Sequence, residues 1–96
     1  MKVFKVKVGK MAGYGSSCIL RYNGDYYILV KKVECADGKI KYIDEKIELT
    51  DLYWDKSNPK QLVGYYTASW LGVDGEPIVQ ERVITIEEEL KLEIGL

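Results

Sequence analysis

Residues 61–96 read QLVGYYTASWLGVDGEPIVQERVITIEEELKLEIGL, and this stretch decides the fold. Its centre, Asp74-Gly75, lies between two runs that are rich in β-branched and aromatic residues. Asp-Gly favours a two-residue hairpin loop in which both residues have positive φ. Such a loop sets Val63 opposite Ile86, with apolar residues opposite apolar ones and Ser69 opposite Gln80. The stretch therefore predicts a long β-hairpin.

A further strand is expected after the hairpin, because apolar and charged residues alternate over residues 89–96. Two helical alternatives compete with these strands. Asn58-Pro59 could begin a helix over residues 59–71, and residues 87–93 could form a short helix. Strand-forming residues in the first segment and strict alternation in the second favour strands in both places.

The chain begins with a strand pattern, KVFKVKV at residues 2–8, in which lysines alternate with apolar residues. This first strand presents lysines outward, whereas the last presents Glu89 and Glu93. Complementary charges on neighbouring strands support pairing. The first and last strands are therefore expected to pair, either within one chain or across a dimer.

Two more hairpins are predicted in the first half of the chain. A loop at Asn23-Gly24 sets Cys18 opposite Leu29, and a loop at Asp37-Gly38 sets Glu34 opposite Lys41. The apolar positions of the next strand change parity near residues 44–45, which predicts a β-bulge there. Residues 50–58 are expected to form a connection, with one helical turn after Thr50.

These elements predict one all-β domain over residues 1–96. The expected architecture is a small barrel or sandwich of six to seven mainly antiparallel strands, arranged as a meander of hairpins. The Asn23-Gly24 register also separates Cys18 from Cys35 by about 20 Å, since a strand rises about 3.3 Å per residue. A disulfide needs Cα atoms within about 7 Å, so two free thiols are expected.

Composition argues against several functions. The 96 residues contain no histidine, so Ser-His-Asp and Cys-His catalysis are excluded, and two cysteines alone do not complete a zinc site. We therefore expect no catalytic residues, no metal site and no cofactor. No apolar run reaches the roughly 20 residues of a membrane-spanning helix, and no secretory signal pattern begins the chain, which favours a cytoplasmic protein. Abundant Lys and Glu with few Asn and Gln are typical of thermophilic proteins.

Two segments resemble functional motifs only in part. The glycine-rich residues 9–17 place Gly-Lys before the other glycines and a strand after them, unlike a phosphate loop, so an ordinary connection is expected. Carboxylates at Asp44, Glu45, Asp51 and Asp55 could gather at one sheet end, but their spacing does not match a calcium loop. A small carbohydrate-active domain that uses these carboxylates is the least favoured alternative.

Aromatic residues carry the leading functional prediction, because eight Tyr and two Trp exceed what a small core can bury. Tyr and Trp are enriched in protein interfaces. We expect a non-enzymatic protein-interaction module, with a protein partner or a second copy of the chain in a homodimer. The expected interaction surface comprises Tyr14, Tyr22, Tyr26, Tyr53, Trp54, Tyr65 and Trp70.

Charge distribution supplies the alternative function. Residues 1–48 carry a net charge of +4 and residues 49–96 carry −5, from ten basic against six acidic residues and four against nine. A basic, tyrosine-containing β-surface can bind single-stranded nucleic acid. In this alternative a small β-barrel contacts phosphates through Lys10, Arg21, Lys31 and Lys32, with Tyr22 and Tyr26 stacking on bases.

Overall fold

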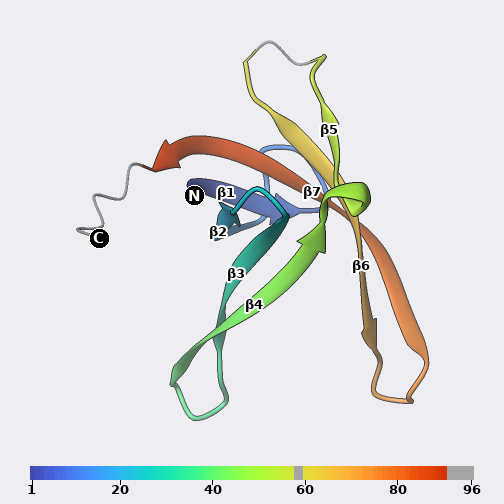
Figure 1. Ribbon diagram of the computed structural model, residues 1–96. Helices are drawn as coiled ribbons and strands as arrows, with labels where there is room; N and C mark the ends of the chain where they lie inside the picture. The colour runs from blue at the N-terminus through green and yellow to red at the C-terminus, as the bar shows by residue number, and fades with distance from the viewer. Residues whose placement is uncertain (58–59, 91–96) are drawn as a thin grey trace.

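The computed structural model describes residues 1–57 and 60–90, which form seven antiparallel strands in one curled sheet (Figure 1). The sheet makes a half-barrel and does not form a sandwich, so the all-β prediction is confirmed and the barrel alternative is the closer one. The elements are β1 (Lys2–Gly9), β2 (Ser16–Tyr22), β3 (Tyr26–Glu34), β4 (Ile40–Glu48), the 3₁₀ turn η1 (Leu49–Asp51), β5 (Tyr53–Asp55), β6 (Val63–Leu71) and β7 (Pro77–Leu90).

The strand order is β4-β3-β2-β1-β7-β6-β5. Every pair of consecutive strands is therefore hydrogen-bonded except β4 and β5, which are the two edges of the sheet. β1 pairs with β7, the second strand of the predicted long hairpin, with Lys5 opposite Glu88 and Phe4 opposite Glu89. The predicted pairing of β1 with a last strand over residues 89–96 falls mostly outside the described residues. The β1–β7 register shifts between Lys5 and Val6, so Glu87 is the extra residue of a bulge.

The core lies on the inner face of the curled sheet. Its fully buried side chains come from neighbouring strands: Val6 on β1, Leu20 on β2, Leu29 on β3 and Ile84 on β7. Alternation along each strand sends these residues to one face and leaves Lys5 and Lys7 of β1 on the other. We call the face that carries this cluster the inner face and the opposite one the outer face.

Both Asp-Gly turns differ from the predicted two-residue loops, and the register of each hairpin is wrong by one residue. In each, only the glycine (Gly38 or Gly75) has positive φ, near +80°. A type I′ loop needs positive φ at both residues, so a three-residue loop with a glycine bulge forms instead. Gly72 N–H donates to the Glu76 carbonyl at 2.8 Å. Val63 consequently faces Thr85, and Glu34 faces Ile40.

The Asn23-Gly24 hairpin is displaced by two residues from the prediction, because the loop residues are Gly24 and Asp25. Asn23 Oδ1 accepts hydrogen bonds from the backbone N–H groups of Asp25 and Tyr26, at 2.9 and 3.0 Å. Leu20 therefore faces Leu29, where the prediction had Cys18. A shift of two residues leaves each side chain on its predicted face.

The predicted bulge near residues 44–45 is absent, because β4 pairs with β3 in one unbroken register from Glu48 to Ile40. The bulge was needed only to reconcile the wrong turn register with the burial of Ile47. In the observed register Ile43, Glu45 and Ile47 all point to the inner face, and Ile40 and Tyr42 point outward.

The remaining predictions are largely confirmed. Residues 63–71 and 77–90 are strands, whereas the possible last strand beyond residue 90 lies outside the described residues. The predicted connection contains η1 and the short strand β5. Both cysteines are free thiols. No helix in the described part of the chain has the length and apolar character needed to cross a membrane.

Candidate functional site

The half-barrel is open along one seam, between β4 and β6. β5 covers β6 only from Val63 to Tyr65, so β6 has no described neighbour on that side from Tyr66 onward. The chain bridges the seam at one end through η1, and Figure 1 shows the β3–β4 and β6–β7 hairpins diverging from there toward their turns. The radius of gyration, 14.4 Å, exceeds the roughly 12.5 Å of a compact domain this long, as expected for an open sheet.

Both edges of the seam carry backbone groups that no described strand pairs with. In the β3–β4 turn, Cys35 N–H donates to the Lys39 carbonyl at 2.8 Å. In an antiparallel ladder, hydrogen-bonded residue pairs alternate with non-hydrogen-bonded pairs. The backbone N–H and C=O groups of the odd-numbered β4 residues therefore bond to β3, and those of the even-numbered residues point away from β3. The same reasoning from the Gly72–Glu76 hydrogen bond applies to β6. The backbone N–H and C=O groups of Thr67, Ser69 and Leu71 point away from β7, toward the seam. The seam is thus a site at which an extended strand can add its hydrogen bonds.

Between these edges, on the inner face, lies a groove of about 490 Å³, which we call the seam groove. Its lining comes from β3, β4, β6 and β7: Lys31, Ile43, Asp44, Glu45, Ala68, Ser69, Trp70 and Arg82. Lys31 Nζ forms an ion pair with Glu45 Oε2, a buried oxygen atom. The Arg82 guanidinium lies 5.8 Å from the centre of the Trp70 ring, within the range of a cation–π contact.

The seam groove continues into a smaller cavity of about 230 Å³ that shares Lys31 and Arg82 and includes Cys18 and Tyr66. Burial raises the pKa of the Cys18 thiol; nearby Lys31 lowers it and Glu45 raises it again. Burial also raises the pKa of Tyr66, with a further contribution from Glu45. Both groups therefore stay protonated at neutral pH. A protonated, buried thiol is a poor nucleophile, so this cluster gives no support to cysteine catalysis.

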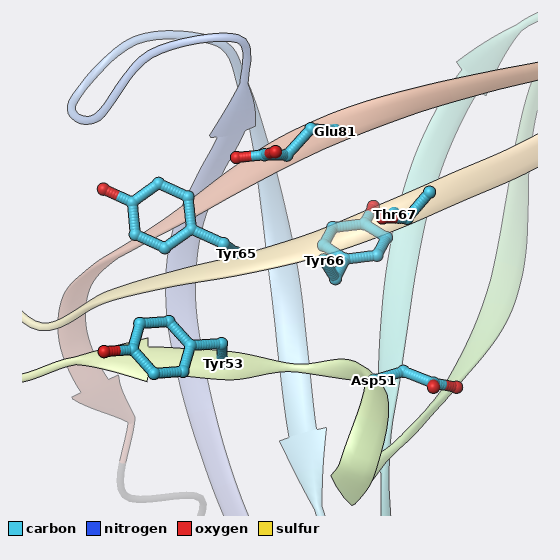
Figure 2. A pocket seen from close by; sticks show the side chains of 6 residues that line it. All are labelled: Asp51, Tyr53, Tyr65, Tyr66, Thr67 and Glu81. Carbon is cyan, nitrogen blue, oxygen red and sulfur yellow. The ribbon is translucent and has the colours of Figure 1, made fainter.

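A second hollow lies on the outer face, where β5 leaves β6 (Figure 2). Its lining includes Asp51, Tyr53, Tyr65, Thr67 and Glu81. The Tyr53 and Tyr65 rings lie side by side, 6.5 Å between centres, and Figure 2 shows both hydroxyls pointing the same way. In Figure 2 the Asp51 carboxylate points away from the tyrosine pair, whereas the Glu81 carboxylate points toward it. The two carboxylates therefore do not face each other as in a two-carboxylate hydrolase.

The predicted carboxylate cluster does not form. Asp44 and Glu45 lie within β4, Asp51 ends η1, and Asp55 ends β5, where its Oδ1 accepts a hydrogen bond from Ser57 N–H at 2.9 Å. Within residues 1–57 and 60–90, no three His, Cys, Asp or Glu side chains gather to bind a metal ion. Glu45 lies in a strand, as expected, and one of its carboxylate oxygens is buried.

The seven aromatic residues of the predicted interaction surface lie in separate places. Tyr14 is in the β1–β2 loop, and Tyr26 is on the outer face beneath Lys46 Nζ, at 4.4 Å. Tyr22 and Trp54 both pack on Tyr27 on the inner face, next to the β2–β3 turn. Tyr53 and Tyr65 form the outer pair. Only Trp70 lines the seam groove.

The four predicted cationic residues are also dispersed. Lys10 lies in the β1–β2 loop, and Lys31 is in the ion pair of the seam groove. Arg21 and Lys32 point to the outer face of β2 and β3, as the pairing of Arg21 with Ile28 and of Lys32 with Tyr42 shows. The glycine-rich loop packs against β7, because Gly13 N–H donates to the buried Thr85 Oγ1 at 2.7 Å.

Exposed apolar side chains are concentrated at the two hairpin ends that border the seam. On β3–β4 they are Val33, Ile40, Tyr42 and Ile43; on β6–β7 they are Trp70, Leu71, Val73, Ile78 and Val79. Contiguous exposed apolar surface in a small protein marks an interaction site. Sequence reasoning missed Ile43, Glu45 and Arg82. The apolar pattern of the β3–β4 hairpin carried a signal, but the wrong turn register assigned Ile40 and Tyr42 to the inner face.

Comparisons with protein-family models, curated proteins and solved structures gave no match to this chain.

Proposed function

We propose that this chain is a non-enzymatic protein-interaction module that binds an extended polypeptide strand at the seam. The observation that carries the proposal is the outer edge of β4, which no strand of residues 1–57 and 60–90 pairs with along any of its nine residues. Strand addition to an exposed sheet edge is a recurrent mode of peptide recognition, in which backbone hydrogen bonds give affinity and alternate side chains give specificity.

The side chains around the edge support this function. Long, exposed and partly apolar edges promote unwanted pairing, and proteins normally protect them. Here Ile40 and Tyr42 are 52% and 66% exposed on the edge strand itself. An added strand would cover them and would place alternate side chains in the seam groove, next to Ile43 and Trp70.

A selection from a displayed library of random twelve-residue peptides tests this function. Binding of selected peptides is then measured by calorimetry with two variants of one residue, Asp44→Pro and Asp44→Ala. Asp44 N–H points away from β3, so proline removes the edge donor without breaking the β3–β4 ladder. We expect Asp44→Pro to weaken peptide binding at least about tenfold and Asp44→Ala to change it little. The proline removes one backbone hydrogen bond and blocks the edge, and together these losses should reduce the binding free energy by more than about 1.4 kcal/mol, which corresponds to tenfold. Peptides that bind both variants equally would contradict the proposal.

One observation favours the nucleic-acid alternative, on a different surface. On the outer face, the half-buried residues Ile19, Ile28 and Val30 form an apolar floor. Basic side chains flank this floor, since Lys5 pairs with Ile19 on β2, Arg21 with Ile28, and Ile28 with Lys46. Tyr26 and Tyr42 lie on the same face.

This alternative is tested by the anisotropy of fluorescein-labelled single-stranded DNA and RNA at two salt concentrations. A labelled ligand is required because Trp54 and Trp70 are on the inner face, away from the basic surface. Binding that weakens with salt and is lost in Arg21→Glu would support it. Absence of binding at low salt would exclude it.

A further inference from the structure

We infer that the β4 edge pairs with β4 of a second copy of this chain, antiparallel and with two-fold symmetry about Ile43. The inference rests on the proposed function, because it uses the same free edge and names its occupant. In the resulting homodimer two half-barrels join through one continuous sheet.

The backbone restricts how two β4 strands can pair. Only the even-numbered residues direct N–H and C=O groups outward, so hydrogen-bonded pairs must join even to even. A symmetric antiparallel pair of identical strands is then centred on a single residue, as in other isologous contacts. The central choices are Tyr42, Ile43 and Asp44.

The inner-face side chains select Ile43 as the centre. In that register Ile43 faces Ile43 of the second copy, and Lys41 faces Glu45 of the second copy on both sides of the axis. These are non-hydrogen-bonded pairs, in which side chains approach most closely. Glu45 would then lie between Lys31 of its own chain and Lys41 of the other, so that its carboxylate is paired on both sides.

The other two centres are less favourable. A centre at Asp44 sets Asp44 against Asp44 of the second copy, and like charges directly opposite each other are destabilising. A centre at Tyr42 sets the apolar Ile43 against the charged Lys41, and it makes Lys39, a turn residue outside β4, the residue that faces Glu45. With Ile43 at the centre, the outer face pairs Tyr42 with Asp44 and Ile40 with Lys46, and no like charges meet.

The first experiment measures the mass of the full chain by sedimentation equilibrium over a range of concentrations. We expect a reversible dimer. Lys41→Glu places two carboxylates opposite each other on both sides of the axis and should raise the dimer dissociation constant at least about tenfold, from cross-strand pair energies of up to about 1 kcal/mol each. Lys39→Glu is the matched control, since it makes the same charge change on the same hairpin opposite an apolar residue, Ile47.

The second experiment tests the register by disulfide cross-linking in a Cys35→Ser background, where the native Cys18 thiol is buried. Ile43→Cys should cross-link, because Cα atoms of a directly opposed non-hydrogen-bonded pair are about 4.5 Å apart. Tyr42→Cys and Asp44→Cys should not cross-link. Residue 42 of one copy faces residue 44 of the other, so two identical cysteines lie diagonally across the pair, about 8 Å apart.

A chain that stays monomeric at every concentration would overturn the inference, and the charges of β4 would then protect its edge. A dimer that persists unchanged in Asp44→Pro would also overturn the inference, as would cross-linking at residue 44 in place of residue 43. Peptides that bind at β4 in a monomeric protein would overturn the inference and leave the proposed function intact. A dimer with the expected register and no peptide binding would restrict the function to self-association.

Discussion

Glu45, on the edge strand of the half-barrel, directs its carboxylate to the inner face and forms an ion pair with Lys31 of the neighbouring strand. The two side chains are 28% and 37% exposed, so solvent screens their attraction. The pair places charge beside Cys18 and Tyr66, both of which have a raised pKa to which Glu45 contributes.

Glu45→Gln is therefore expected to have a small effect on stability. It should lower the free energy of unfolding by no more than about 1 kcal/mol, because partly exposed ion pairs contribute little. Urea denaturation followed by circular dichroism measures this change. Lys39→Gln, at an exposed cation on the same hairpin outside the ion pair, is the control. A loss of several kcal/mol would mean that Glu45 is buried far more completely than the structure shows.

Stability is expected to fall at alkaline pH because of Tyr66. Burial raises the pKa of Tyr66 in the folded protein well above its ordinary value of 10.0. Below pH 10 the Tyr66 phenol is protonated in both the folded and the unfolded states, so its contribution to stability is complete. Above pH 10 the unfolded chain loses the phenolic proton while the folded protein keeps it, and this favours unfolding. The free energy of unfolding of the wild type should therefore decrease between pH 10 and pH 11 more steeply than that of Tyr66→Phe. Equal slopes for the two proteins would contradict this assignment.

The β1–β2 loop provides a test with two glycines. A Cβ at Gly15 would lie 2.1 Å from the Val8 carbonyl oxygen, whereas a Cβ at Gly13 has open space. Both residues have positive φ. Gly13→Ala should cost about 1 kcal/mol, from backbone conformation alone, and Gly15→Ala about 2 kcal/mol or more. Thermal denaturation compares them, and similar melting temperatures would argue against the close approach of the loop to β1.

Trp54 gives a test at the closed end of the seam. Trp54 Nε1–H donates to Tyr27 Oη at 3.0 Å, and the rings meet edge to face at 5.9 Å. Tyr27→Phe leaves this indole donor without its acceptor and should destabilise by about 1–2 kcal/mol. Tyr22→Phe removes only an exposed hydroxyl that donates to the Gly24 carbonyl, so its effect should be smaller. The indole N–H resonance of Trp54 should shift only in the first variant.

Much of the fold follows from local pattern. Alternation along the chain identified the strands, because it depends on residues that are close in sequence. The charge argument named Glu89 as an acidic neighbour of the β1 lysines, whereas Glu88 is the residue that faces Lys5. The turn registers were wrong where one backbone dihedral decided them. Asp37 and Asp74 do not take the positive φ of a type I′ loop, and the three-residue loop that results moves each ladder by one position.

The candidate site could not be predicted in the same way. It exists because β4 and β5, although consecutive, do not pair, and that outcome depends on the curvature of the whole sheet. The register error had a further effect, since it placed Ile40 and Tyr42 inside and assigned Glu45 to solvent. The residues that line the seam groove were therefore not recognised as one surface from the sequence.

The strand order has a consequence for folding kinetics. β1–β4 and β5–β7 are each built from hairpins between consecutive strands, and among the described strands the β1–β7 ladder is the strand pairing that joins the two groups. This contact closes the longest loop in the chain, so we expect it to limit the folding rate. The two halves carry net charges of +4 and −5, which attract each other before they touch. Added salt should therefore slow refolding while leaving the unfolding rate nearly unchanged.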